Sequence, residues 1–250
     1  MSMMAYNSAL RSGERAGERV RADADLMPLM RLQGRAQFVR LGNCCALAAL
    51  GSGFVYVVAK GVVGIECAVV SGVRVITALL YPGDVVVPEL QAPLPGLALK
   101  SQRSAEFWKI TTTAFAEESI GDNRLWQTIF LRLNAQNARQ QMHAAAMAAL
   151  NSEERVAAFL VESGTRLGIP SGRSISFELP LSRYSIADYL SLNADTVSRT
   201  FSALAAAKII ERRGRFQISV RDWSALAAKC PLSEAIIKLH EAGKPVLTTR

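Results

Sequence analysis

Residues 182–220 restrict the possible folds more than any other part of the chain. Apolar side chains recur at helical spacing in two short stretches, with Ile186, Ala187 and Leu190 in the first and Val197, Phe201 and Leu204 in the second. Such stripes must face a core. The link Ser191-Leu192-Asn193 is short enough for two helices to cross at a steep angle, and Asn193 can cap the second helix. The spacing therefore predicts a helix-turn-helix.

The outward face of the second helix carries side chains that suit base recognition. Asp195, Ser198 and Arg199 stand at i, i+3 and i+4 near its amino end. Arginine can donate two hydrogen bonds to guanine, aspartate can accept one from cytosine, and serine adapts to several partners. We therefore expect these three residues to read bases in the major groove. Three further residues are expected to contact phosphates: Arg183, Thr196 and Thr200.

A basic hairpin is expected directly after this helix. Alternate residues beyond the turn at Gly214 are apolar, as in a half-buried strand; they are Phe216, Ile218 and Val220. Three arginines at the turn are expected to contact phosphates: Arg212, Arg213 and Arg215. From Arg199 to Arg221, six lysines or arginines stand against a single acidic residue, Glu211. This excess is typical of a wing that contacts the DNA backbone.

The overall charge agrees with a polyanionic partner. The formal net charge is +8 and the pI is about 9.6, which suits either nucleic acid or an anionic membrane surface. The clustering of arginines near the second helix favours double-stranded DNA. The first residues have no apolar core of a secretory signal, and the uncharged run 44–59 is shorter than a bilayer span and contains two glycines. We expect a cytoplasmic protein with no membrane partner.

Residues 36–110 consist of short β-rich runs separated by glycine at intervals of about ten residues. The spaced glycines are Gly42, Gly51, Gly61, Gly72 and Gly83. Such spacing is typical of a small two-sheet roll. We therefore expect an α+β chain in five parts: a flexible arm at 1–24, a sensor-like β-roll at 25–121, a dimerisation helix at 122–150, a winged helix-turn-helix unit at 151–230, and a C-terminal extension at 231–250. The extension is expected to pack against the unit before it.

The stretch 122–150 has the spacing of a long helix with a two-stranded coiled-coil seam. The expected seam residues are Trp126, Ile129, Phe130, Leu133, Asn137, Gln140, Ala144 and Met147. Polar residues in the middle of such a seam can set its register. The alternative is an ordinary packed helix in a monomer. A cap signal at Asn151, followed by Glu154, indicates that a new helix and a new unit begin there.

Taken together, these segments resemble the CRP/FNR family of transcription regulators, and most closely its FNR and FixK branch. The similarity rests on I-A-D-Y-L, on D-T-V-S-R-T-F, on K-I-I-E before the glycine-centred basic turn, and more weakly on the β-rich run 54–86. The resemblance implies a homodimer that reads a palindrome with TTGAT-like half-sites and contacts RNA polymerase. Asp195 stands where the family has glutamate, and Ser191 where it often has a turn glycine.

No cofactor or metal is predicted. Cyclic-AMP binders of the family carry Gly-Glu and then Arg-Ser/Ala-Ala, but no glycine precedes Glu89, and the string Arg103-Ser104-Ala105 is interpreted as coincidence rather than as a shifted cassette. The four cysteines, Cys44, Cys45, Cys67 and Cys230, do not form the N-terminal group that holds an iron–sulfur cluster. They are interpreted as reduced thiols, with redox sensing as the alternative. His143 and His240 are interpreted as core or surface residues rather than as haem ligands.

Other functions are less well supported. The two histidines are far apart, and the chain has no glycine-rich phosphate loop and no Gly-x-Ser-x-Gly motif, so an enzyme is not expected. Two alternatives stay open: a regulator whose β-roll binds an unidentified small ligand, and an interaction module that has lost DNA binding.

Overall fold

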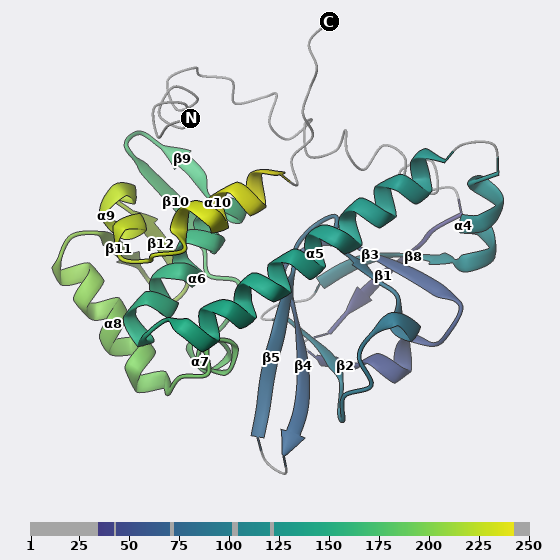
Figure 1. Cartoon of the computed structure of the whole chain (residues 1–250), viewed down its shortest axis with the longest axis horizontal. Helices are drawn as coiled ribbons and strands as arrows, with labels where there is room; N and C mark the ends of the chain where they lie inside the picture. Colours follow the sequence, from purple (N-terminus) through teal and green to yellow (C-terminus); the bar gives the residue numbers. More distant parts are fainter. Residues whose placement is uncertain (1–34, 43, 71–72, 102–104, 121–122, 243–250) are drawn as a thin grey trace, which may run out of the picture.

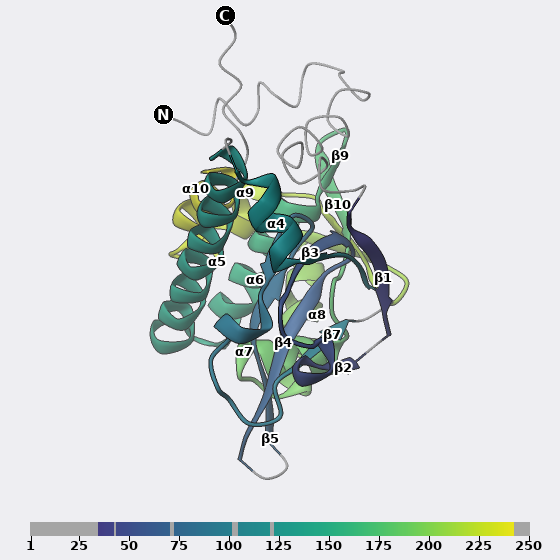
Figure 2. The same ribbon diagram turned by 90° about the vertical axis from the view of Figure 1, so that its right-hand side faces the viewer.

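The computed structural model describes residues 35–242 apart from 43, 71–72, 102–104 and 121–122. It has a β-roll and a C-terminal α/β unit, with the long helix α5 (Arg124–Ala149) running between them (Figure 1). A second view at right angles places α5 along one side of the molecule (Figure 2). The expected arm at 1–24 lies outside the described residues. No helix within the described ranges is both long and apolar enough to cross a bilayer.

The β-roll consists of two four-stranded antiparallel sheets. Their strand orders are β1-β8-β3-β6 and β2-β7-β4-β5. The strands are β1 (Gln37–Leu41), β2 (Cys44–Ala46), β3 (Phe54–Lys60), β4 (Val63–Val70), β5 (Val73–Leu80), β6 (Val85–Val86), β7 (Ala98–Ser101) and β8 (Ala105–Thr111). The short helices η2 (Leu47–Leu50), η3 (Pro88–Leu90) and α4 (Thr112–Glu118) complete the roll. Gly61 and Gly83 adopt φ of +87° and +88°, a backbone conformation that glycine reaches without steric cost.

Large side chains from both sheets occupy the interior of the roll. Tyr56, Leu80, Leu99 and Phe107 are each at most 2% exposed and belong to one apolar cluster. The hydroxyl of Tyr56 donates to the carbonyl of Leu50 and so satisfies its only polar atom. Burial of this area is the main stabilising contribution to the roll.

Helix α5 is attached to the roll by apolar and polar contacts. Leu125 and Ile129 pack in a cluster with Val55, Val57 and Ile110 of the β1-β8-β3-β6 sheet. About two turns further on, the buried amide of Gln136 accepts from the backbone N–H of Val85 at 2.8 Å and donates to its carbonyl at 2.9 Å. The side chain thereby acts as an additional partner for edge strand β6.

The C-terminal unit combines helices with a four-stranded sheet in the order β11-β12-β10-β9. Its elements are α6 (Ser152–Leu167), β9 (Ile169–Ser171), β10 (Ser174–Glu178), α7 (Arg183–Leu190), α8 (Ala194–Ala206), β11 (Ile210–Arg213), β12 (Gln217–Val220), α9 (Trp223–Ala228) and α10 (Ser233–Ala242). Helix α6 begins with a capping box, in which Asn151 and Glu154 exchange side-chain and backbone hydrogen bonds.

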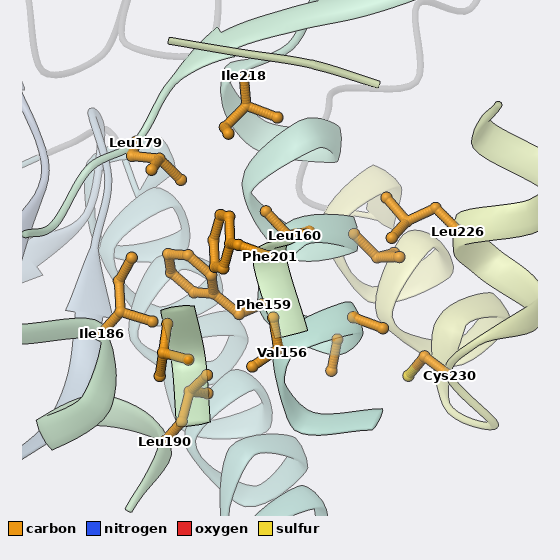
Figure 3. Packing of buried hydrophobic residues seen from close by; sticks show 14 of the residues in the cluster. Val156, Phe159, Leu160, Leu179, Ile186, Leu190, Phe201, Ile218, Leu226 and Cys230 are labelled. Atoms are coloured by element: carbon orange, nitrogen blue, oxygen red, sulfur yellow. The ribbon is translucent and has the colours of Figure 1, made fainter. Parts of the chain in front are cut away.

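One apolar core holds this unit together (Figure 3). Phe159 and Leu160 of α6 lie at its centre, next to Phe201 of α8 and Ile186 of α7. The three apolar residues predicted to face inward from α8 are all buried: Val197, Phe201 and Leu204. The predicted fold class, an α+β chain with a β-roll, a long helix and a winged helix-turn-helix, is confirmed.

The same core continues into the β-roll. Ile76, Leu79 and Tyr81, in and just after β5, belong to the cluster that contains the helix-turn-helix residues. Helix α10 covers another side of this core, and its residues Ile236 and His240 are 5% and 4% exposed. The expectation that the extension packs on the preceding unit is thus confirmed as far as residue 240.

We predict that His240 lowers stability in mild acid. Burial, together with the positive charges of Arg166 and Arg139, lowers the pKa of His240 from 6.5 to about 3. Below about pH 6.5 the unfolded chain therefore binds a proton at this residue that the folded chain does not, so the free energy of unfolding falls as the pH falls. The contribution approaches at most about 1.4 kcal/mol per pH unit. Urea denaturation from pH 7.5 to 5 should show a shallower fall in His240→Gln than in the native protein.

Lys238→Gln, at an exposed position on the same helix, is the matched control and should keep the native slope. Equal slopes in the native protein and His240→Gln would show that the folded protein accepts a proton at His240.

Candidate nucleic-acid interface

The two helices of the helix-turn-helix each begin at a side-chain cap. Ser182 accepts a hydrogen bond from the backbone N–H of Ser185 at the start of α7, and Asn193 accepts one from Asp195 at the start of α8. Ser191 between them adopts φ +52° and ψ +47°, the left-handed region. This conformation explains why glycine suits the position.

The amino-terminal half of α8 presents polar groups to solvent. Asp195 and Arg199 are exposed and Ser198 is half-buried. Arg183 reaches over from α7, because its Nη1 donates to Oγ of Ser198 at 3.2 Å. Arg199 donates to the hydroxyl of Thr196 at 3.3 Å. The structure therefore brings the three predicted base-reading residues and two predicted phosphate contacts onto one surface.

The wing lies beside this surface. Strands β11 and β12 pair antiparallel up to Arg213 and Gln217, and Gly214 turns the chain with φ +69°. Burial and the nearby positive charge of Arg183 lower the pKa of Arg212. Both guanidinium groups would gain from an anion bound near them.

Part of the wing charge is neutralised within the wing. Glu211 pairs with Arg213 at 3.1 Å and with Arg221, and hydrogen bonds from both arginines lower the pKa of this carboxyl group. Four other arginines have no ion-pair partner among the described residues: Arg183, Arg199, Arg212 and Arg215. We call these four residues the free-arginine group. A concentration of unpaired cations is the usual electrostatic footprint of a phosphate-binding surface.

The prediction for Thr200 is wrong. Its side chain is 7% exposed, and its hydroxyl donates to the carbonyl of Thr196 in the same helix. At i+3 from Val197 and i−4 from Leu204, Thr200 lies on the buried stripe of α8 rather than on its outward face. Sequence reasoning also missed Tyr184, which is 76% exposed beside Arg183 at the start of α7. Its position next to a predicted phosphate contact was the available signal.

The predicted seam on α5 mixes two faces of the helix. Ile129 is buried in the cluster that joins α5 to the β-roll, and Leu133 packs against the same cluster. Met147 packs against the core of the C-terminal unit. Ile129 is therefore covered by its own chain, whereas Leu133 and Met147 are half-buried and their place at the dimer seam stays a prediction.

A different stripe on α5 faces solvent. Trp126 and Phe130 are 52% and 68% exposed, and the exposed positions then recur at spacings of three and four. They are Gln127, Phe130, Asn134, Asn137, Gln141, Ala144 and Ala148. Of the predicted seam residues, Trp126, Phe130, Asn137 and Ala144 lie on or beside this stripe, and Gln140 is exposed at its edge.

Several residues considered for a cofactor or metal site have other roles in the structure. Glu89 accepts a hydrogen bond from the backbone N–H of Gly53 and so has a structural role, while residues 103 and 104 of the possible cassette lie outside the described ranges. Burial raises the pKa of the thiols of Cys45, Cys67 and Cys230, which disfavours the reactive thiolate. No group of three or more metal-binding side chains occurs in the part of the chain that the structure describes.

Comparison with known proteins identifies relatives of both units. Residues 154–229 match the family model of the Crp-like helix-turn-helix domain. The nitrogen fixation regulation protein FixK of Rhizobium meliloti is 32% identical over 177 residues, which cover 70% of this chain and 77% of FixK. The transcriptional activatory protein AadR of Rhodopseudomonas palustris is 47% identical over 60 residues, or 24% of this chain and 25% of AadR.

Solved structures agree on the fold. The structure of FixK2 from Bradyrhizobium japonicum matches with a TM-score of 0.65 and 25% identity, over 78% of this chain and 97% of FixK2. A CooA mutant from Carboxydothermus hydrogenoformans matches with a TM-score of 0.63 over 88% of this chain and 93% of CooA. At 17% identity, the CooA match supports the fold alone.

The relatives are regulators rather than enzymes, and their similarity extends over both the β-roll and the helix-turn-helix. The chain therefore belongs to the CRP/FNR family of DNA-binding transcription regulators, near its FixK branch.

Proposed function

We propose that the protein binds an inverted repeat in double-stranded DNA as a homodimer, with α8 of each copy in one of two successive major grooves. The observation that carries the proposal is the free-arginine group around the exposed end of α8. In this arrangement Asp195, Ser198 and Arg199 read bases. Arg183, Thr196 and the wing arginines Arg212, Arg213 and Arg215 hold the phosphates on either side.

The exposed stripe of α5 supports the dimer. Its three-and-four spacing fits a two-stranded coiled coil, in which Phe130 supplies an apolar contact and Asn137 a polar one that sets register. A two-fold axis along α5 would direct the two α8 helices to the same side of the DNA, with half-site centres about 34 Å apart.

The proposal assigns one task to each part of the chain. The unit 151–230 reads DNA, the helix 122–150 joins the two copies, and the roll 25–121 supports that helix. Activation through contact with RNA polymerase is proposed because AadR is named as an activator. Such a regulator acts in the cytoplasm, where bacteria keep their DNA. No resident cofactor is assigned, since Tyr56, Leu80, Leu99 and Phe107 occupy the interior of the roll.

The first test is binding to a duplex with two inverted TTGAT half-sites, compared with a scrambled duplex. We expect the native protein to prefer the repeat, and Arg199→Ala to lose about 1–3 kcal/mol of that preference because it removes a bidentate base contact. Fluorescence anisotropy measures both affinities. If Asp195 selects a different half-site from glutamate, selection from random DNA should still recover an inverted repeat.

Arg173→Ala is the matched control, because Arg173 is also exposed but lies in the β9–β10 hairpin, away from α8 (Figures 1 and 2). It should leave the preference unchanged. Recovery of no inverted repeat by the native protein, or an equal loss in both variants, would contradict the proposal.

Substitutions of the wing arginines should differ in how much they change the salt dependence of DNA binding. Arg215→Ala should reduce the slope of log affinity against log salt by about one, because it removes a cation that no carboxylate neutralises. Arg213→Ala should reduce the slope less, since Arg213 is already paired with Glu211. Anisotropy titrations between roughly 50 and 200 mM salt measure both slopes. Equal slopes in the two variants would contradict this assignment.

The dimer should depend on the exposed stripe of α5. Phe130→Glu should convert the protein to a monomer, because it places two like charges opposite each other at the seam. Ile169→Glu makes the same kind of change at an apolar residue that is 70% exposed but lies on β9 of the C-terminal unit, and should leave the dimer intact. Sedimentation equilibrium distinguishes the two states. A dimer in Phe130→Glu, or a monomer only in Ile169→Glu, would place the interface elsewhere.

A further inference from the structure

A buried carboxylate lies where the β-roll and the C-terminal unit meet. The Oη of Tyr81, just after β5, donates to Oε1 of Glu162 on α6 at 2.9 Å. The Oη of Tyr189 on α7 donates to Oε2 of the same carboxylate at 3.3 Å. Tyr81 and Tyr189 are 1% and 4% exposed. Glu162 therefore accepts one hydrogen bond from the roll and one from the helix-turn-helix.

The roll side of this junction is held firmly. Asp84 accepts from the backbone N–H of Tyr81 at 2.8 Å and pairs with Arg139 of α5 at 2.5 Å. The guanidinium of Arg166, on α6, stacks 4.7 Å from the centre of the Tyr81 ring. The position of Tyr81 is thus tied to the roll, to α5 and to α6 at once.

The C-terminal side involves the helix-turn-helix and the last helix. The ring of Tyr189 stacks on His143 of α5, with centroids 4.0 Å apart and planes 7° from parallel. His240 of α10 places Nε2 3.9 Å from Oε1 of Glu162 and its ring edge against Tyr81. Helix α10 therefore covers the junction, although it lies beyond the residues that match the helix-turn-helix family model.

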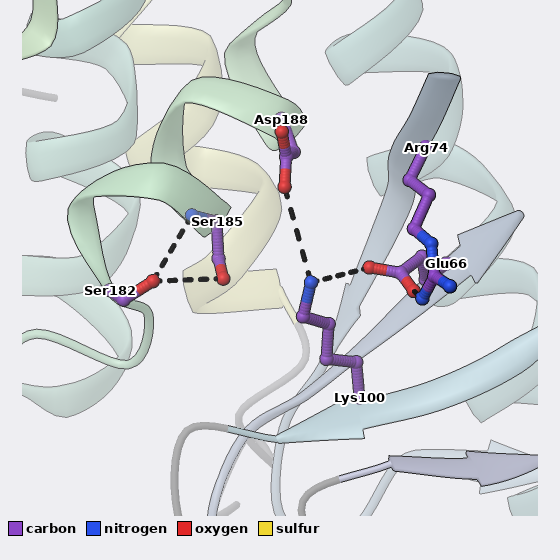
Figure 4. Close-up of polar contacts among 6 residues, drawn as sticks. All are labelled: Glu66, Arg74, Lys100, Ser182, Ser185 and Asp188. Carbon is purple, nitrogen blue, oxygen red and sulfur yellow. Dashed lines mark hydrogen bonds and ion pairs between the residues drawn. The ribbon is translucent and has the colours of Figure 1, made fainter. Parts of the chain in front are cut away.

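A second contact between the two units lies nearer the surface (Figure 4). Lys100 of β7 is 2.5 Å from Glu66 of β4 and 4.0 Å from Asp188 of α7. The side chains of Lys100 and Asp188 are 29% and 36% exposed, so water screens their attraction. The Glu162 junction is the more enclosed contact, and an ion pair at the surface cannot replace it.

The junction does not have the space of an effector site. A cavity of about 30 Å³ lies beside Glu162, between Arg139, His143 and His240. Nε of Arg139 and Nδ1 of His240 are buried there without a hydrogen-bond partner in the described chain. This space suits one or two water molecules that would pair with these atoms. It is too small for an organic ligand, so the side chains themselves must set the geometry.

We infer that Glu162, held by Tyr81 and Tyr189, is a positioning residue that sets the distance between the two recognition helices of the dimer. Directed hydrogen bonds to a buried carboxylate are satisfied in only one arrangement of the two units, whereas apolar contacts tolerate sliding. Because α5 joins the copies and α6 and α7 carry α8, the angle fixed at Glu162 sets the half-site spacing that the dimer accepts. The inference rests on the proposed dimeric binding to an inverted repeat.

The test uses two variants, each of which removes one tyrosine hydroxyl that donates to the carboxylate of Glu162. Tyr81→Phe removes the hydrogen bond between the two units, whereas Tyr189→Phe removes the one within the C-terminal unit and keeps a ring that can stack on His143. Affinities are measured for the inverted-repeat duplex selected by the native protein, and for versions with one base pair added or removed between the half-sites.

We expect the native protein and Tyr189→Phe to lose about tenfold or more in affinity when the spacing changes, since each base pair rotates one half-site by roughly a tenth of a turn. In Tyr81→Phe the loss should shrink by about threefold or more, in line with the loss of one hydrogen bond. A purely structural role would lower all affinities by a common factor and leave this ratio unchanged.

Several results would overturn the inference. One is that Tyr81→Phe loses as much affinity as the native protein when the half-site spacing changes. Another is that this loss becomes smaller by the same factor in both variants. Absence of any inverted-repeat preference in the native protein would instead remove the proposed function. In that case, amide hydrogen exchange without DNA tests whether Glu162 positions the two units. Faster exchange in β5 and α6 of Tyr81→Phe, but not of Tyr189→Phe, supports this role. Unchanged exchange in Tyr81→Phe excludes it.

Discussion

The structure depends on the burial of α6 around most of its circumference. From Val156 to Val161 every residue is at most 6% exposed, so this helix has no solvent face along its central turns. A helix that is apolar on all sides must be surrounded by other elements. Here α8, β10, α9 and α10 all contact it, and Tyr189 of α7 packs edge-on against Phe159. Displacing α6 would expose all of these surfaces together.

Because α6 is so enclosed, a polar residue on it strongly affects how the surrounding elements are oriented. Glu162 follows directly after the buried run and accepts hydrogen bonds from both the β-roll and α7. Burial raises the pKa of Glu162, although both tyrosines and the nearby arginines favour its charged form. A buried carboxylate of this kind contributes little net stability, but it discriminates strongly between arrangements of its donors. The apolar core thus supplies stability, and the polar junction supplies orientation.

At the proposed DNA-facing surface, by contrast, the polar side chains contribute little to the fold. There the arginines are exposed or half-buried, and most have no carboxylate partner among the described residues. Phosphates would supply the opposite charges that the arginines of this surface lack. Arg183 of α7 affects the pKa of Arg212 in the wing only through the tertiary structure, since these residues are far apart in the sequence. In the proposed interface, affinity for DNA would therefore depend on contacts that do little for the fold.

Local sequence determined the helix-turn-helix, its caps at Ser182 and Asn193, and the turn at Gly214, because these features depend on side chains a few residues apart. Only the tertiary structure decided which side of α5 is free. Ile129 and Phe130 are adjacent apolar residues, yet the β-roll covers the first and leaves the second 68% exposed. It likewise brought Tyr81, Glu162 and Tyr189 together. Periodicity shows that a helix has an apolar side, but the partner that covers it comes from distant segments, whose positions a single sequence does not specify.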